Sequence, residues 1–144
     1  MSNQVGYIKD SFSNILSTYK RKVLWTSTAT SLNASTISIP DLNKYDWIEI
    51  FFYNFTEAQK GISSTSCEVS NGAVINLFYT INNIGNNICH FGSRLGTINT
   101  NNNTITWTQI LGCVVPTTGG TPSATTGRQD WGVPFKIVGW KYGN

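Results

Sequence analysis

The chain has 144 residues, of which 40 % are hydrophobic and 12 % are charged, and its net charge is +3. A charged fraction near half the usual ~25 % argues against a disordered tail, a coiled coil or an acidic activator, while the length suits one domain with a sizeable core. Abundant Thr, Ser, Asn and Gly favour strands and turns over helices, so we expect an all-β protein.

The first segment, residues 1–20, is expected to be a short arm ahead of a β domain that spans residues 21–144. Ile8, Phe12 and Ile15 lie at helical spacing, which favours an amphipathic helix. The polar residues in the middle of the arm favour instead a hairpin of two short strands, so both alternatives stay open.

The N-terminal sequence lacks the basic, apolar and small-residue regions of a signal peptide, and no apolar run approaches the ~20 residues of a membrane span. We therefore expect synthesis in a cytoplasm and no membrane insertion. The basic run at residues 20–22 carries no interleaved aromatic residues that would stack on bases, so nucleic-acid binding is not expected.

Period-two alternation of β-branched and aromatic residues then predicts strands over residues 22–28, 36–39 and 46–53. In the third of these strands the even-numbered residues are apolar and are expected to face a core: Ile48, Ile50 and Phe52.

The odd-numbered face of the same strand is too aromatic for ordinary solvent. It carries Trp47, Phe51 and Tyr53 beside the carboxylate of Glu49. A second sheet, another subunit, a ligand or the connection that follows the strand would each cover it, since exposed aromatic patches mark interfaces. We favour a subunit contact.

The middle of the chain begins with residues 54–72, which are expected to be a long polar connection. Alternation then predicts strands over residues 74–81 and 88–95, and residues 97–103 are expected to form an Asn-rich turn. The apolar face of the first of these strands is expected to meet a core: Ile75, Leu77, Tyr79 and Ile81.

The C-terminal part shows the clearest alternation in the chain, which predicts one strand over residues 104–115. Residues 116–132 are expected to be a loop, and residues 135–140 a final strand. About seven strands separated by turns, with no helical stretch after the arm, predict an antiparallel β-sandwich or a jelly roll.

The sequence contains no catalytic or metal-binding motif. His90 is the one histidine, which excludes a metal site built from several histidines. A catalytic role for it has little support, because its neighbour Cys89 points to the opposite face of the strand. Cys67, Cys89 and Cys113 form no CxxC pair and are expected to be reduced thiols. We expect no catalytic residue, no metal and no cofactor.

The loop over residues 116–132 holds the candidate ligand-binding residues, because long loops in compact domains are commonly functional. Arg128, Asp130 and Trp131 bring together a guanidinium, a carboxylate and an indole, which suit a sugar or a protein partner. Alternatively, Trp131 packs its ring back onto the edge of the sandwich, as buried tryptophans commonly do.

Three short stretches resemble a known group of proteins. The sequence from Tyr7 to Leu16 resembles the "KDxxGN" hairpin that opens many tail-fibre and baseplate proteins of phages infecting Gram-positive bacteria, with Ser13 in place of the usual Gly. Residues 22–26 look like the start of their C-terminal β-sandwich modules. Residues 134–141 are similar to the "I-x-G-x-K" strand that closes such modules.

The resemblance implies a non-enzymatic virion protein, made in the host cytoplasm, that displays a β-sandwich as a homotrimer. Its expected partner is a host cell-surface saccharide or another virion protein. A capsid decoration or head-fibre protein is the alternative within virions, and a small carbohydrate-active enzyme is the alternative from a different class.

Overall fold

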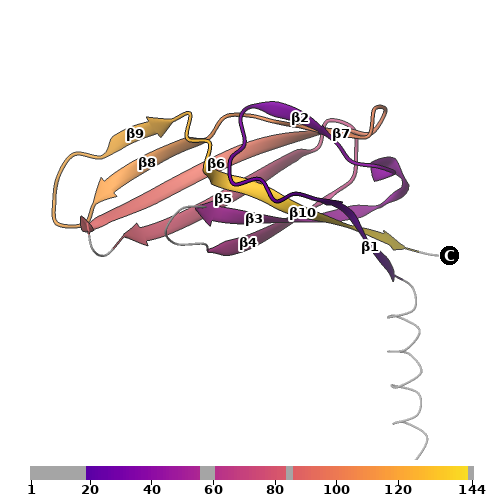
Figure 1. Cartoon of the computed structure of the whole chain (residues 1–144), viewed down its shortest axis with the longest axis horizontal. Helices are drawn as coiled ribbons and strands as arrows, with labels where there is room; N and C mark the ends of the chain where they lie inside the picture. The colour runs from indigo at the N-terminus through magenta and orange to yellow at the C-terminus, as the bar shows by residue number, and fades with distance from the viewer. Residues whose placement is uncertain (1–18, 56–60, 84–85, 143–144) are drawn as a thin grey trace, which may run out of the picture.

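A computed structural model describes residues 19–55, 61–83 and 86–142 of the chain. Within these residues, ten strands form two antiparallel sheets that pack against each other (Figure 1). The expected all-β class and antiparallel sandwich are therefore confirmed. The expected arm lies outside the described residues as far as residue 18, and the first strand begins at Tyr19.

One sheet has four strands in the order β1-β10-β3-β4. Its central strands β10 and β3 are long and pair along most of their length, with a register shift between Pro134 and Lys136. The bounds of its strands are β1 (Tyr19–Thr26), β3 (Trp47–Phe55), β4 (Ile62–Glu68) and β10 (Trp131–Tyr142).

The other sheet has six strands in the order β2-β7-β6-β8-β9, with β5 paired to the opposite edge of β6. A 3-10 turn, η1 (Leu42–Lys44), lies between β2 and β3. The bounds of the six strands are β2 (Ser35–Ser38), β5 (Val74–Asn83), β6 (Ile88–Asn99), β7 (Thr104–Trp107), β8 (Leu111–Pro116) and β9 (Ser123–Thr126).

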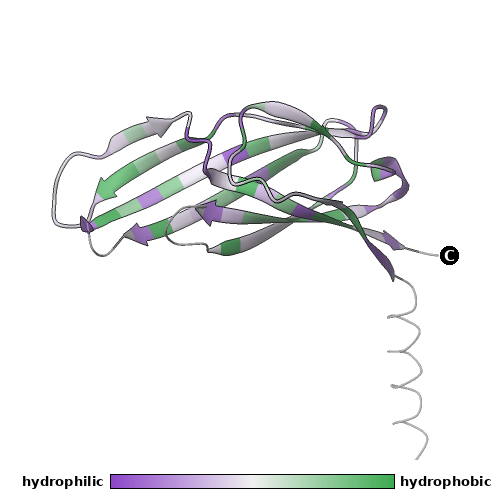
Figure 2. Cartoon of the chain, viewed as in Figure 1, coloured by the Kyte–Doolittle hydropathy of each residue, from purple (hydrophilic) through white to green (hydrophobic). Residues whose placement is uncertain are grey.

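The core lies between the two sheets and is built from alternate residues of most strands, and Figure 2 shows the alternating hydropathy along them. Ile48, Ile50 and Phe52 of β3 are buried as expected, and so are Ile75, Leu77 and Tyr79 of β5, while Ile81 is partly buried against the core. The chief buried residues are, from the four-stranded sheet, Ile48, Ile50, Phe52 and Ile137 and, from the six-stranded sheet, Ile75, Leu77, Tyr79, Ile98, Ile105 and Trp107.

Two expected connections contain strands. The region of residues 54–72 holds β4, whose inward positions are small or polar and whose outward positions include one apolar residue, Ile62, so it carries little hydrophobic signal. The expected turn at 97–103 starts late, because β6 continues to Asn99. The expected loop at 116–132 holds β9 and the start of β10.

The expected strand over residues 104–115 is two strands, β7 and β8, which pair in succession with the same edge of β6. Residues 108–110 interrupt them, although the Thr108 amide still donates to the Leu95 carbonyl at 2.8 Å. The interruption reverses the alternation of exposed and buried residues. An even-numbered residue, Thr106, is exposed before it, and an odd-numbered residue, Leu111, is exposed after it. Ile110, inside the interruption, is fully buried and anchors it to the core.

Candidate binding face

The outer face of the four-stranded sheet is turned away from the core. It carries the odd-numbered aromatic residues of the strand that was predicted over residues 46–53. Directly opposed residues of antiparallel strands point to the same side of a sheet. Trp47 of β3 is opposed by Trp140 of β10, and Glu49 of β3 is opposed by Ser66 of β4. Two indoles, a carboxylate and a hydroxyl therefore lie on one surface.

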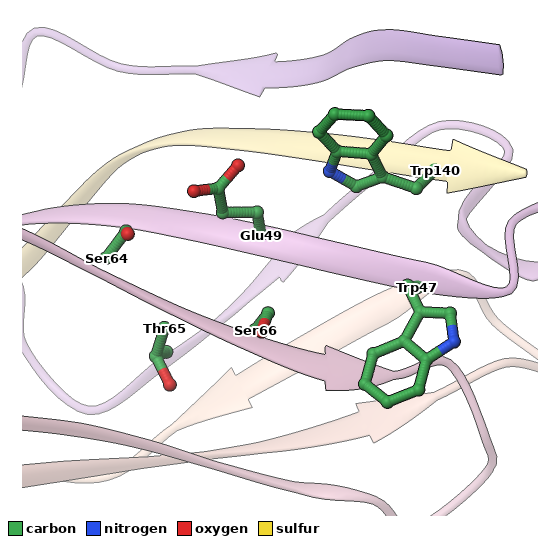
Figure 3. Close-up of a pocket in the computed structure, with 6 residues that line it drawn as sticks. All are labelled: Trp47, Glu49, Ser64, Thr65, Ser66 and Trp140. Carbon is green, nitrogen blue, oxygen red and sulfur yellow. The ribbon is translucent and has the colours of Figure 1, made fainter. Parts of the chain in front are cut away.

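These side chains border an open hollow of about 550 Å³. In Figure 3 the carboxylate of Glu49 rises from β3 between Trp140 on β10 and Ser66 on β4. Trp47 is 48 % exposed, so its ring is accessible from solvent. The residues lining the hollow are Trp47, Glu49, Ser64, Thr65, Ser66 and Trp140.

Ring contacts hold side chains in and around the hollow in place. The guanidinium carbon of Arg21 lies 5.2 Å from the centroid of the Trp140 ring, and the Lys136 ammonium lies 5.2 Å from that of Phe51. Tyr53 stacks on Phe135 with the ring centroids 4.4 Å apart. The face thus consists of aromatic rings fixed by cations and by one another.

The structure excludes two of the four covers expected for the face that carries Trp47, Phe51 and Tyr53. Their face is the outside of the sandwich, so the second sheet does not cover it, and the described part of residues 54–72 lies beside β3 as β4 rather than above it. Phe51 and Tyr53 are half-buried by their neighbours. A subunit contact or a ligand remains as the expected cover for this face.

The structure brings Arg128, Asp130 and Trp131 together at the start of β10. The Arg128 guanidinium donates two hydrogen bonds to the Asp130 carboxylate, at 2.9 and 2.7 Å, and lies 4.8 Å from the Trp131 ring centroid. Trp131 is only 3 % exposed and packs edge-on against Tyr79 and His90. The indole therefore packs onto the sandwich, the second of the two alternatives drawn from the sequence, and presents no open ring for stacking.

Arg94 connects this cluster to the core. The sequence does not predict this role. It lies on the inner face of β6 and is fully buried. Its guanidinium donates to the backbone carbonyls of Thr108 at 2.8 Å and Trp131 at 3.1 Å. Burial lowers its pKa, although the carbonyl contacts keep the charged group hydrogen-bonded. The cluster is a structural tie between β6, the 108–110 interruption and β10.

His90 and the cysteines occupy sites typical of structural residues. His90 packs against the Trp131 ring, 5.0 Å between centroids, and burial followed by the charge of Arg128 lowers its pKa. Burial raises the pKa of the Cys67 thiol to about 11, which makes it a poor nucleophile at neutral pH. Among the described residues, no group of three or more His, Cys, Asp or Glu could hold a metal ion.

Comparisons of this chain with protein-family models, curated proteins and solved structures returned no match. In the described ranges, no helix has the length and apolar character needed to cross a membrane.

Sequence reasoning found Trp47 and Glu49 but missed Trp140, Ser64 and Ser66. Trp140 was visible as the last aromatic residue of an expected strand, yet nothing local indicates that β10 lies next to β3 rather than at an edge. The serines were missed because β4 was not predicted as a strand.

Proposed function

We propose that the protein is a non-catalytic binding module that recognises saccharide on the outer face of its four-stranded sheet. The observation that carries the proposal is the pair of indoles, Trp47 and Trp140, beside Glu49 and two serines in one open hollow. An indole offers an apolar face to the C–H side of a sugar ring, while the carboxylate and hydroxyls bond to its hydroxyl groups.

The hollow favours a neutral saccharide over an anionic one. Glu49 is the charged residue among those that line it, and a carboxylate accepts hydrogen bonds from sugar hydroxyls. The same charge repels the carboxylate of a uronic or sialic acid across a few ångströms. The openness of the hollow suits one or two sugar units within a longer chain.

The biological setting that we propose is a phage virion, as a tail-fibre or baseplate component that contacts the host surface. Its support is the resemblance at residues 7–16, 22–26 and 134–141, together with a β-sandwich that carries a solvent-facing aromatic hollow. In that setting a host cell-wall polysaccharide is the natural ligand.

The test is a glycan array of neutral and anionic oligosaccharides, followed by calorimetric titration of the strongest neutral binder. We expect Trp140→Ala to weaken binding about tenfold, the loss of about 1.4 kcal/mol of stacking, and Glu49→Gln to weaken it less. Glu49→Gln should also remove the discrimination against anionic sugars.

Ile62→Ala is the matched control, because Ile62 is an exposed apolar residue of β4 that does not line the hollow. It should bind as the unaltered protein does. Absence of binding to every glycan at millimolar concentration, or equal binding by Trp140→Ala, would refute the proposal.

A further inference from the structure

The outer face of the six-stranded sheet carries a second exposed apolar surface. It lies on the side of the sandwich opposite the proposed binding face on the four-stranded sheet, which we call the saccharide face. Strand register places Phe78, Ser93 and Leu111 in one row across β5, β6 and β8, and Phe91 beside Cys113 in a neighbouring row. Phe78 is 58 % exposed and Leu111 is 62 % exposed. We call this surface the neutral face; its exposed large apolar residues are Val74, Phe78, Phe91, Leu95 and Leu111.

The neutral face presents no charged side chain among the described residues. From Ser70 to Gly127 the sequence holds one Asp, Glu, Lys or Arg, and that residue, Arg94, is buried in the core. By contrast, the outer face of the four-stranded sheet carries Arg21, Glu49 and Lys136. Depletion of charge around exposed aromatic and aliphatic residues is the composition of an interface centre.

Two pairs of polar side chains on the neutral face are hydrogen-bonded to each other. The Ser93 hydroxyl donates to the Asn76 side-chain oxygen at 2.6 Å, between Phe78 and Leu95. The hydroxyls of Thr36 and Thr106 lie 2.9 Å apart at the far end. Burying a polar group costs less free energy when its hydrogen-bond partner lies within the sheet than when its partner is water.

We infer that the neutral face is the site at which a second copy of this chain packs, sheet against sheet. A second copy fits this face by charge. The chain has a net charge of +3, and joining two neutral faces places no charge opposite another and keeps both charged faces on the outside. Apolar, Thr, Ser and Asn side chains can also pack against the same set of side chains, at the ~10 Å spacing of sheets packed face to face.

The test is the mass of the full chain in solution, measured by light scattering at about 100 µM. We expect at least twice the 15.9 kDa of the chain for the unaltered protein. Leu111→Lys and Phe78→Lys bring like charges together at the centre of the interface, so each should weaken association more than tenfold and give a monomer. Circular dichroism establishes that both variants are folded.

Ile62→Lys is the control, because it places the same charge on an equally exposed apolar residue of the other sheet. It should associate as the unaltered protein does. A monomeric unaltered protein overturns the inference, and so does association that survives Leu111→Lys and Phe78→Lys but is lost in Trp47→Lys. Glycan titration of the same samples tests the proposed function separately, so failure of one leaves the other standing.

Discussion

At the scale of single residues, Arg94 stands out because it is a charged side chain that is fully buried in the core. Exposed arginines are ordinary on a strand, and the sequence gives no sign that this one faces the core. Its acceptors are backbone carbonyls of residues 108 and 131, which are remote along the chain. A buried guanidinium cannot be foreseen from local pattern, because the groups that satisfy it come together only in the folded sheet.

We predict that Arg94→Met lowers the free energy of unfolding by about 3 kcal/mol, because buried carbonyls lose their donor and the packing around them loosens. Urea denaturation followed by tryptophan fluorescence measures the change. Lys20→Met, at an exposed position of β1, is the control and should stay within about 0.5 kcal/mol. A loss below about 1 kcal/mol for Arg94→Met would mean that the carbonyls find other donors.

At the scale of elements, β6 organises its sheet, since β5, β7 and β8 all pair with it. Two glycines on its inner face make room for aromatic rings directly opposite them. Gly92 is paired with Tyr79, and Gly96 is paired with Trp107. A Cβ at Gly92 would overlap the Tyr79 side chain, and a Cβ at Gly96 would lie 2.6 Å from the Trp107 ring. Each ring fills the space left by a missing side chain.

We predict that Gly92→Ala and Gly96→Ala each destabilise the fold by about 2 kcal/mol, because a buried ring must shift off its preferred rotamer. Thermal unfolding monitored by circular dichroism is the measurement. Thr97→Ala, on the outer face of the same strand, should change stability by under about 0.5 kcal/mol. Equal effects of the three substitutions would show that strand propensity, and not ring packing, sets the stability of β6.

Strands with strong alternation were predictable, whereas strands of small polar residues were not. β3 and β5 alternate large apolar residues with others, so their position and core face follow from the sequence. β4 and β9 are built mostly from Ser, Thr and Ala, and backbone pairing with β3 and β8 holds them. Their strand state depends on the neighbour, which a local pattern does not contain.

At the scale of the whole molecule, charge separates the two sides of the sandwich. The saccharide face carries charged residues among its rings, and the neutral face carries none in the part of the sheet that the structure describes. The sequence predicted one aromatic surface and assigned it to a subunit contact. The register of both sheets shows two distinct surfaces, so the proposed saccharide binding and the proposed self-association need not compete for one face.

Our last prediction joins both proposals and rests on both of them. Two copies that meet through their neutral faces hold their saccharide faces on opposite sides, about 30 Å apart for four stacked sheets. Faces that point in opposite directions cannot both bind one flat surface, so dimer formation adds little avidity there. They can instead bridge two separate polysaccharides.

The unaltered protein should therefore agglutinate beads coated with the neutral polysaccharide that it binds, whereas Leu111→Lys should bind the beads without agglutinating them. Both proteins should have the same affinity for the soluble oligosaccharide, because Leu111 lies on the sheet opposite the hollow. Turbidity of the bead suspension and calorimetric titration provide the two readings. Agglutination by a monomeric Leu111→Lys variant would place a second sugar site within one chain and contradict the bridging geometry.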